Sequence, residues 1–148
     1  GLIVAHMSYD QLRQLFALRE GLEGMATRLA ACHASAAEIA LLQEMVAEDA
    51  RTSDPAVLIQ SNKRFHRQIV LASHNEYMIE ALNNLSVHLG LLPGSTYAGA
   101  GRIQAAQAEH EAIVDAIASR QGARAEAAAR KHISSGLTIR LRMLTQGS

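Results

Sequence analysis

Apolar side chains recur at intervals of three and four residues along most of the chain. The clearest example lies between residues 9 and 32, where the apolar positions include Leu12, Leu15, Leu22, Met25, Ala26 and Leu29. A period of 3.6 residues indicates an amphipathic α-helix, whereas a half-buried strand alternates with a period of two. No stretch of useful length has the strand period. The pattern therefore predicts an all-α fold.

Helix-start and turn signals divide this pattern into six predicted helices. Ser35 is followed three residues later by Glu38, the capping-box spacing, and Asp54-Pro55 places an N-cap before a proline at the first helical position. The segment "PGSTYAGAG", residues 93–101, predicts a long glycine-rich loop, either a lid or an ordinary connector. The predicted helices span about 9–32, 35–51, 54–73, 76–91, 102–119 and 123–145. Their short connections favour an antiparallel bundle.

Composition and charge narrow the function classes. Hydrophobic residues make up 49% of the chain and aromatic residues only 3%, so the core must be mainly aliphatic. Lys+Arg and Asp+Glu are equal at 14 each, which argues against an electrostatic nucleic-acid surface on this chain. Cys32 is the only cysteine, so no internal disulfide can form, as suits a reducing compartment such as the cytoplasm. No apolar run reaches the length of a membrane-spanning helix.

The first residues, "GLIVAHMS", have the character of a protease and cloning remnant, with an N-terminal glycine and a His-Met pair. We expect residues 1–7 to be vector-derived and residues 8–148 to form one domain. On this interpretation the domain was cut from a longer natural protein.

Three histidines fall on the apolar faces of three different predicted helices. His66, His110 and His132 each have aliphatic or small neighbours one turn away, and Asn62 lies one turn before His66 on the same face. Histidine is the commonest nitrogen ligand of zinc-like metals, and three protein nitrogens leave positions open for water or a ligand. The alternative is a satisfied polar network that fixes helix register in the core.

Two arginines are candidates for binding a carboxylate, which a guanidinium group holds bidentately. Arg19 lies on or near the inward face of the first predicted helix, and the alternative is a surface pair with Glu23. Arg102 lies two turns before His110, beside the glycine-rich loop, and the alternative is a solvent-exposed side chain.

Four segments occur in a defined order: "LREGLEGMATRLAA" (18–31), "NKRFHRQIVLASHNEYM" (62–78), "EHEAIVDAI" (109–117) and "AEAAARKHISSGL" (125–137). Together they resemble the FadR-type C-terminal domain (FCD) of GntR-family bacterial transcription regulators. The resemblance extends over about residues 9–145, which is nearly the whole chain.

The resemblance implies an antiparallel bundle of six to seven helices that binds a small carboxylate effector. In metal-binding members of the family the ligands are an Asp or Asn and three histidines, which here are Asn62, His66, His110 and His132. The implied cofactor is a divalent metal, zinc or nickel. Asn62 supplies a neutral amide oxygen, a weaker donor than a carboxylate. The resemblance also implies a homodimer in the full-length protein and DNA binding through an N-terminal winged helix, to which nothing here is similar.

These observations favour a non-enzymatic, ligand-sensing domain of a transcription regulator over two alternatives. The first alternative is a metal-dependent, hydrolase-like enzyme, because a metal on three histidines can activate water. Against it, the sequence has no HExxH motif and no nucleophile elbow, and Glu109 and Glu111 are predicted to point away from the face of His110. The second is a metal-free helical dimerisation module, which would leave the three inward histidines without a reason.

Overall fold

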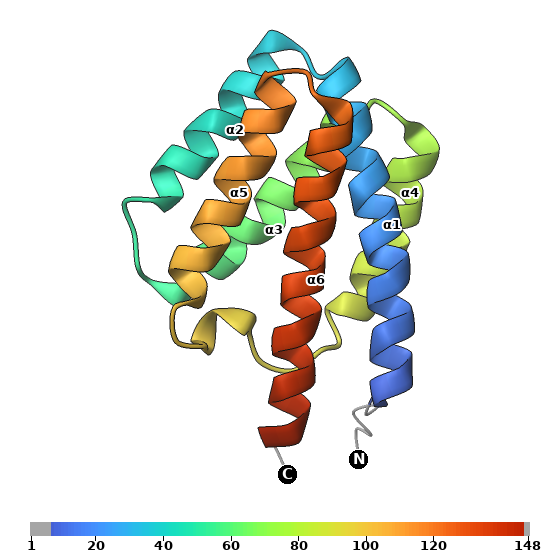
Figure 1. Ribbon diagram of the computed structural model, residues 1–148, viewed down its shortest axis with the longest axis vertical. Helices are drawn as coiled ribbons and strands as arrows, with labels where there is room; N and C mark the ends of the chain where they lie inside the picture. The colour runs from blue at the N-terminus through green and yellow to red at the C-terminus, as the bar shows by residue number, and fades with distance from the viewer. Residues whose placement is uncertain (1–6, 147–148) are drawn as a thin grey trace.

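The computed structural model describes residues 7–146, which form six α-helices and one 3-10 helix (Figure 1). The elements are α1 (Tyr9–His33), α2 (Ala36–Asp49), α3 (Pro55–Ala72), α4 (Glu76–Leu89), η1 (Thr96–Ala98), α5 (Arg102–Ala118) and α6 (Gly122–Gln146). The all-α prediction is confirmed, and every predicted helix end lies within two residues of the observed one. The segment predicted to be vector-derived lies outside the described residues except for Met7.

Side-chain caps fix where the helices begin. The Ser35 hydroxyl accepts from the Glu38 backbone N–H while the Glu38 carboxylate accepts from the Ser35 N–H, which is the predicted capping box. Asp54 caps α3, and Pro55 occupies its first turn as predicted. Ser8 caps α1 through a second capping box, with Gln11 as the reciprocal partner.

The longest pair of helices forms one side of the bundle. α1 and α6 lie side by side and run antiparallel, so the described ends of the chain meet at one end of the molecule (Figure 1). α5 packs against α6 and α2, and α4 packs against α1. α3 runs behind α6 and contacts α1, α2 and α4. Side chains from α1, α3, α5 and α6 therefore converge on the interior.

The predicted loop at 93–101 is tied to the rest of the bundle. It contains η1, where the Ser95 hydroxyl accepts from the Tyr97 backbone N–H and the Tyr97 ring is buried. Arg140 of α6 donates to the carbonyl oxygens of Pro93 at 2.5 Å and Gly94 at 3.4 Å. Gly101 closes the loop with φ of 74°, a left-handed conformation that glycine adopts without a steric penalty.

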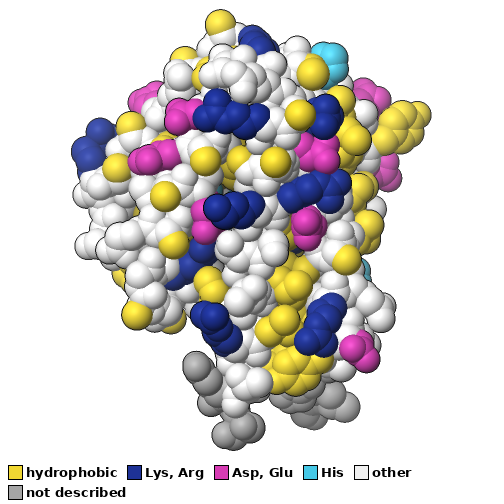
Figure 2. Space-filling model, in the orientation of Figure 1, with side chains coloured by type: hydrophobic (Ala, Val, Ile, Leu, Met, Phe, Trp, Pro, Cys, Tyr) yellow, Lys and Arg dark blue, Asp and Glu magenta, His cyan; other side chains and the backbone are white. Residues whose placement is uncertain are grey.

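The surface agrees with a balanced net charge. On the face shown in Figure 2, basic and acidic side chains are interspersed over the helices. None of the described helices is both long enough and apolar enough to cross a membrane.

Substitution of Phe65 tests how much the core-facing side of α3 contributes to the stability of the fold. Its side chain is fully buried in the main apolar cluster, which also contains Leu42 and Ile113. We expect Phe65→Ala to lower the free energy of unfolding by about 3–5 kcal/mol in urea denaturation, because the substitution leaves a cavity. Tyr77→Ala is the control, since Tyr77 is 83% exposed and should change stability by less than about 0.5 kcal/mol. Equal effects would contradict this packing.

Candidate metal centre and ligand cavity

Three helices bring His66, His110 and His132 together. One ring nitrogen from each lies within 4.8 Å of the others. His66 comes from α3, His110 from α5 and His132 from α6, and the last two are almost fully buried. Phe65 packs against the ring of His110, with 4.5 Å between the ring centroids. The helix-face prediction that these histidines point inward is confirmed.

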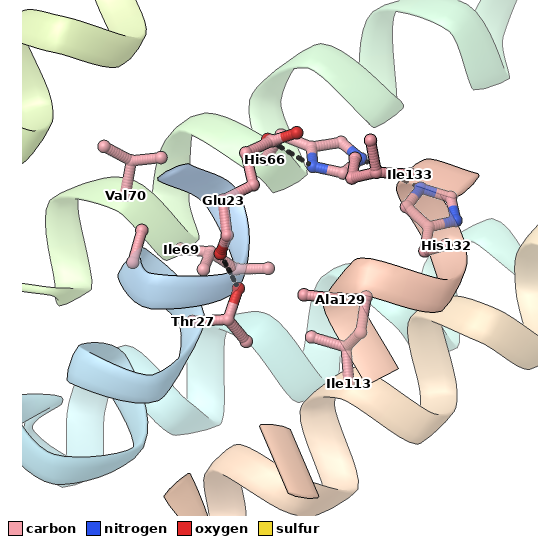
Figure 3. A pocket seen from close by; sticks show the side chains of 10 residues that line it. Glu23, Thr27, His66, Ile69, Val70, Ile113, Ala129, His132 and Ile133 are labelled. Atoms are coloured by element: carbon pink, nitrogen blue, oxygen red, sulfur yellow. Dashed lines mark hydrogen bonds and ion pairs between the residues drawn. The ribbon is translucent and has the colours of Figure 1, made fainter. Parts of the chain in front are cut away.

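Two of the three rings are oriented by carboxylates. Nδ1 of His66 lies 3.1 Å from Oε1 of Glu23, and Figure 3 shows the Glu23 side chain directed at this ring. Nδ1 of His132 lies 2.6 Å from Oε1 of Glu109. An ionised carboxylate only accepts hydrogen bonds, so both Nδ1 atoms must carry the hydrogen. In the neutral rings, both Nε2 atoms therefore present a lone pair.

Those two lone pairs face each other. Nε2 of His66 lies 3.1 Å from Nε2 of His132. Two acceptors at this distance repel unless a positive centre, either a proton or a metal ion, lies between them. A zinc-like ion binds imidazole nitrogens at about 2.0–2.1 Å, which places neighbouring ligand nitrogens about 3.0–3.4 Å apart. The His66–His132 pair already has this spacing.

Each carboxylate is held in turn by an arginine. Nε of Arg19 donates to Oε2 of Glu23 at 2.7 Å. Both terminal nitrogens of Arg102 donate to the two carboxylate oxygens of Glu109, at 3.0 Å each. The result is a chain of contacts from Arg19 through Glu23 to His66, and a second chain from Arg102 through Glu109 to His132. We call these six residues the paired relay.

The pKa values reflect this arrangement. Burial alone would raise the pKa of Glu23, but Arg19 and the neighbouring histidines lower it well below its ordinary value. Burial would likewise raise the pKa of Glu109, and its hydrogen bonds from His132 and Arg102 lower it instead. Both carboxylates are therefore ionised at neutral pH.

The buried histidines are held neutral. Burial lowers the pKa of His132 to about 4, although the hydrogen bond to Glu109 opposes this shift. Burial, followed by the nearby histidines, lowers the pKa of His110 well below 6.5. Neutral imidazole is the form that ligates a metal.

Three buried polar atoms at the site have no hydrogen-bond partner within residues 7–146. They are Oδ1 of Asn62, Nε2 of His110 and Nε of Arg102. Buried polar atoms normally have a partner, so each such exception needs a physical reason. Oδ1 of Asn62 and Nε2 of His110 are donors of the kind that suits a divalent metal; His110 belongs to the histidine cluster, and Asn62 lines the cavity with His66 and His132.

A cavity of about 520 Å³ opens beside the histidines. It is lined by several of the side chains predicted for the site, namely Arg19, Asn62, His66, Arg102 and His132. Its volume lies within the range of roughly 300–1,000 Å³ that is typical of small-molecule sites. A separate void of about 10 Å³ adjoins Glu23, His66 and His132 (Figure 3), close to the smallest space that holds one water.

Three expectations about charged residues need correction. Glu109 was predicted to point off the face of His110 and was given no role beside the histidines, but its side chain lies on His132 and is 16% exposed. The surface alternative for Arg19 and Glu23 is wrong, because the pair is largely buried and lines the cavity. The solvent-exposed alternative for Arg102 is also wrong, because the arginine is 7% exposed. All three errors come from neighbours on other helices, which helical spacing does not show.

Comparisons with known proteins agree with this architecture. The family model described as FCD domain matches residues 14–135. A protein of Paenarthrobacter nicotinovorans named "Probable D-xylose utilization operon transcriptional repressor" is 30% identical over 139 residues, which cover 93% of this chain and 61% of the relative. The chain thus spans less than two thirds of that relative's length.

Two solved structures share the fold. E. coli McbR/YncC superposes with a TM-score of 0.84 at 18% identity, over 94% of this chain and 68% of that one. The metal-free FCD domain of TM0439 superposes with a TM-score of 0.75 at 16% identity, over 96% and 99% of the two chains.

The buried neutral histidines make the stability of metal-free protein depend on pH. Since the pKa values of His110 and His132 are lower in the folded state, the unfolded chain takes up protons first as the pH falls below 6.5. The stability that His110 and His132 contribute by staying neutral is therefore fully present above this pH and is lost progressively below it. Between pH 7.5 and pH 5 we expect the free energy of unfolding to fall by about 2 kcal/mol for each histidine.

Urea denaturation of chelator-treated protein at the two pH values measures this change. His132→Gln should reduce the difference between the two values, whereas His88→Gln, at an exposed position, should leave it unchanged. Stability that is constant or rises toward pH 5 would show that these histidines are not held neutral.

Proposed function

The chain belongs to the FCD domain family, and from this membership we propose that it is the ligand-sensing, dimerising domain of a GntR-type transcription regulator. The relative with 30% identity is named as a transcriptional repressor, which supports a regulatory role in place of an enzymatic one. DNA binding is assigned to a separate N-terminal winged-helix domain of the whole protein, which acts as a homodimer in the cytoplasm. The balanced charge of this chain agrees with that division of roles.

We propose that Asn62, His66, His110 and His132 hold a divalent metal ion, zinc or nickel. The observation that supports this most strongly is the pair of facing Nε2 atoms of His66 and His132, 3.1 Å apart. The unpaired Oδ1 of Asn62 and Nε2 of His110 supply further donors. When bound, the ion would offer a positive centre with open positions for an anionic ligand. Glu23 and Glu109 would orient the ligating rings, as carboxylates commonly do for metal-bound histidine.

The proposed effector is a small organic acid whose carboxylate lies between this site and the arginines. Only Nε of Arg19 is bonded to Glu23, so its two terminal nitrogens are available to a ligand in the cavity. Arg102 lines the same cavity and has an unpaired buried Nε, while its terminal nitrogens are taken up by Glu109. Arg19 is therefore assigned bidentate binding, and Arg102 a single donor.

The enzyme alternative has little support from this geometry. A hydrolase would need a carboxylate free to take a proton from a metal-bound water. Glu23 and Glu109, the two carboxylates in the paired relay, each already accept from a histidine and an arginine. The dimerisation alternative gives no role to the unpaired buried atoms or to the cavity.

The metal site predicts a clear pattern of metal retention. After equal exposure to zinc or nickel and dialysis, wild-type protein should retain about one ion per chain by elemental analysis. His66→Ala, His110→Ala and His132→Ala should each reduce retention by about tenfold or more, because each removes a ligand. His33→Ala, an exposed position at the end of α1, is the control.

Retention that is equal in all four variants would exclude the site. Folding of the variants is checked by circular dichroism, since the domain should fold without metal. The metal-free domain of TM0439, which has the same fold, supports that expectation.

The effector site predicts a thermal shift with small carboxylates. Ligand at a hundredfold excess over its dissociation constant stabilises the native state by about 2.7 kcal/mol, or roughly 5–10 °C in Tm for a domain of this size. The shift should be larger with metal present, and Arg19→Gln should abolish most of it. Arg13→Gln is the control, since Arg13 lies exposed on the same helix, where it pairs with Asp10 and lies over the ring of Tyr9. If no organic acid shifts the Tm of metal-loaded protein, the effector proposal is wrong.

A further inference from the structure

The cavity is strongly basic although the whole chain is neutral. Its lining contains five cationic side chains and one carboxylate, that of Glu23. The cations are Arg19, Lys63, Arg67, Arg102 and Arg140. Over the full sequence, basic and acidic residues are equal in number. The fold therefore concentrates positive charge at this one concave surface.

Three of these cations have no acidic partner. Arg19 pairs with Glu23 and Arg102 with Glu109, whereas Lys63, Arg67 and Arg140 have no ion pair with any carboxylate in residues 7–146. Lys63 and Arg67 are exposed. Arg140 is half-buried, and its hydrogen bonds go to the neutral carbonyl groups of Pro93 and Gly94. A single ligand carboxylate at the histidine end would leave this charge uncompensated.

Arg140 lies about two helical turns after His132 on α6 and lines the same cavity. His132, Gly136 and Arg140 are spaced by four residues along α6, so they share one face, and all three line the cavity. Eight residues of α-helix correspond to about 12 Å along the axis. Burial and the nearby charge of Arg19 lower the pKa of Arg140, which agrees with a position facing α1.

Polar and apolar side chains both line the cavity. Gly136 lies between His132 and Arg140 and has no side chain, so the space is continuous along α6. Asn83, Ser86 and Thr96 also line the cavity and supply amide and hydroxyl groups. Such groups can hydrogen-bond the hydroxyls of a polyol.

We propose that the effector is an elongated dianion, with one acidic group at the histidines and Arg19 and a second at Arg140. This rests on the proposed function, because it assumes that the cavity binds the effector. The chemical class is a sugar acid with a second acidic group, a carboxylate or a phosphate, at the far end of its carbon chain. The hydroxyl groups between the two ends would hydrogen-bond Asn83, Ser86 and Thr96.

Three probes of the same carbon skeleton test this inference. Gluconate has one acidic group, glucarate adds a carboxylate at the far end, and 6-phosphogluconate adds there a phosphate with a charge of about −1.5 to −2 at pH 7. We call the last two probes dianions because each has two acidic groups. Affinities are measured by calorimetry on metal-loaded protein. At least one dianion should bind about tenfold or more tightly than gluconate, since charge-assisted hydrogen bonds are among the strongest polar contacts. Comparing the two dianions distinguishes carboxylate from phosphate.

Variants of α6 test whether Arg140 binds the second acidic group of the ligand. Arg140→Gln should remove most of the advantage of the dianion while gluconate binds as before. Arg142→Gln, at an exposed position on the same helix, should change neither affinity. Arg140→Lys keeps the charge and should retain part of the advantage, so it provides a second test if Arg140→Gln is poorly folded. Gly136→Ala should weaken both dianions, because its methyl group would meet only Phe16, at 3.8 Å, and would project into the cavity.

The outcomes separate this inference from the proposed function. A dianion that binds no better than gluconate, or an advantage that survives Arg140→Gln, would overturn the inference and leave the carboxylate site standing. If none of the three probes binds but shorter acids do, the inference is again wrong. If no acid of any length binds, the proposed function fails with it.

Discussion

The contacts from Glu23 to His66 and from Glu109 to His132 determine the chemistry of this site. Each carboxylate fixes the hydrogen of its histidine on Nδ1 and thereby turns a lone pair on Nε2 toward the centre of the bundle. Without these contacts, either ring could change tautomer and donate a hydrogen bond to the other. With them, the two Nε2 atoms stand 3.1 Å apart as acceptors, and only a positive centre satisfies both. The proposed donor set thus depends on Glu23 and Glu109, which are not among the proposed ligands.

The paired relay also constrains how the helices pack. Two buried carboxylates would be costly alone, because leaving a buried charge unpaired costs about 3–5 kcal/mol. Here Arg19 and Glu23 both come from α1, and Arg102 and Glu109 both come from α5. The histidines that are hydrogen-bonded to these carboxylates come from α3 and α6. Each ion pair lies within one helix, whereas the hydrogen bond from His66 to Glu23 joins α3 to α1 and the one from His132 to Glu109 joins α6 to α5. These helices must therefore keep their relative positions for both hydrogen bonds to form. A ligand that draws Arg19 toward itself would act on this arrangement directly, which gives an effector a physical means of biasing the bundle.

The helices were predictable from the sequence, but the polar partners in the core were not. The helical period of apolar residues and the capping residues Ser35 and Asp54 are local features of the sequence, so they predict where the helices begin and end. The inward direction of the three histidines is also local, since it follows from the face that each shares with apolar neighbours. The partner of Glu109 is not local: His132 lies 23 residues away, and the two meet only because α5 packs on α6. Arg19 and Glu23 have the spacing of an ordinary surface pair, and only the packing of α3 and α6 against α1 buries them.

The charges at the proposed metal site and those in the rest of the cavity act on the same ligand. Within the paired relay, two arginines balance two carboxylates, so the relay is neutral before any ion binds. The three histidines and the amide of Asn62 are neutral donors, so a divalent ion held by them would keep its full charge. An aspartate in place of Asn62 would have cancelled part of that charge within the protein. With the amide, the negative charge that balances the ion must come from the ligand. Lys63, Arg67 and Arg140 add further positive charge to the same cavity. A neutral protein that collects this much positive charge in one cavity is therefore better matched to a ligand with two negative groups than to one with a single carboxylate.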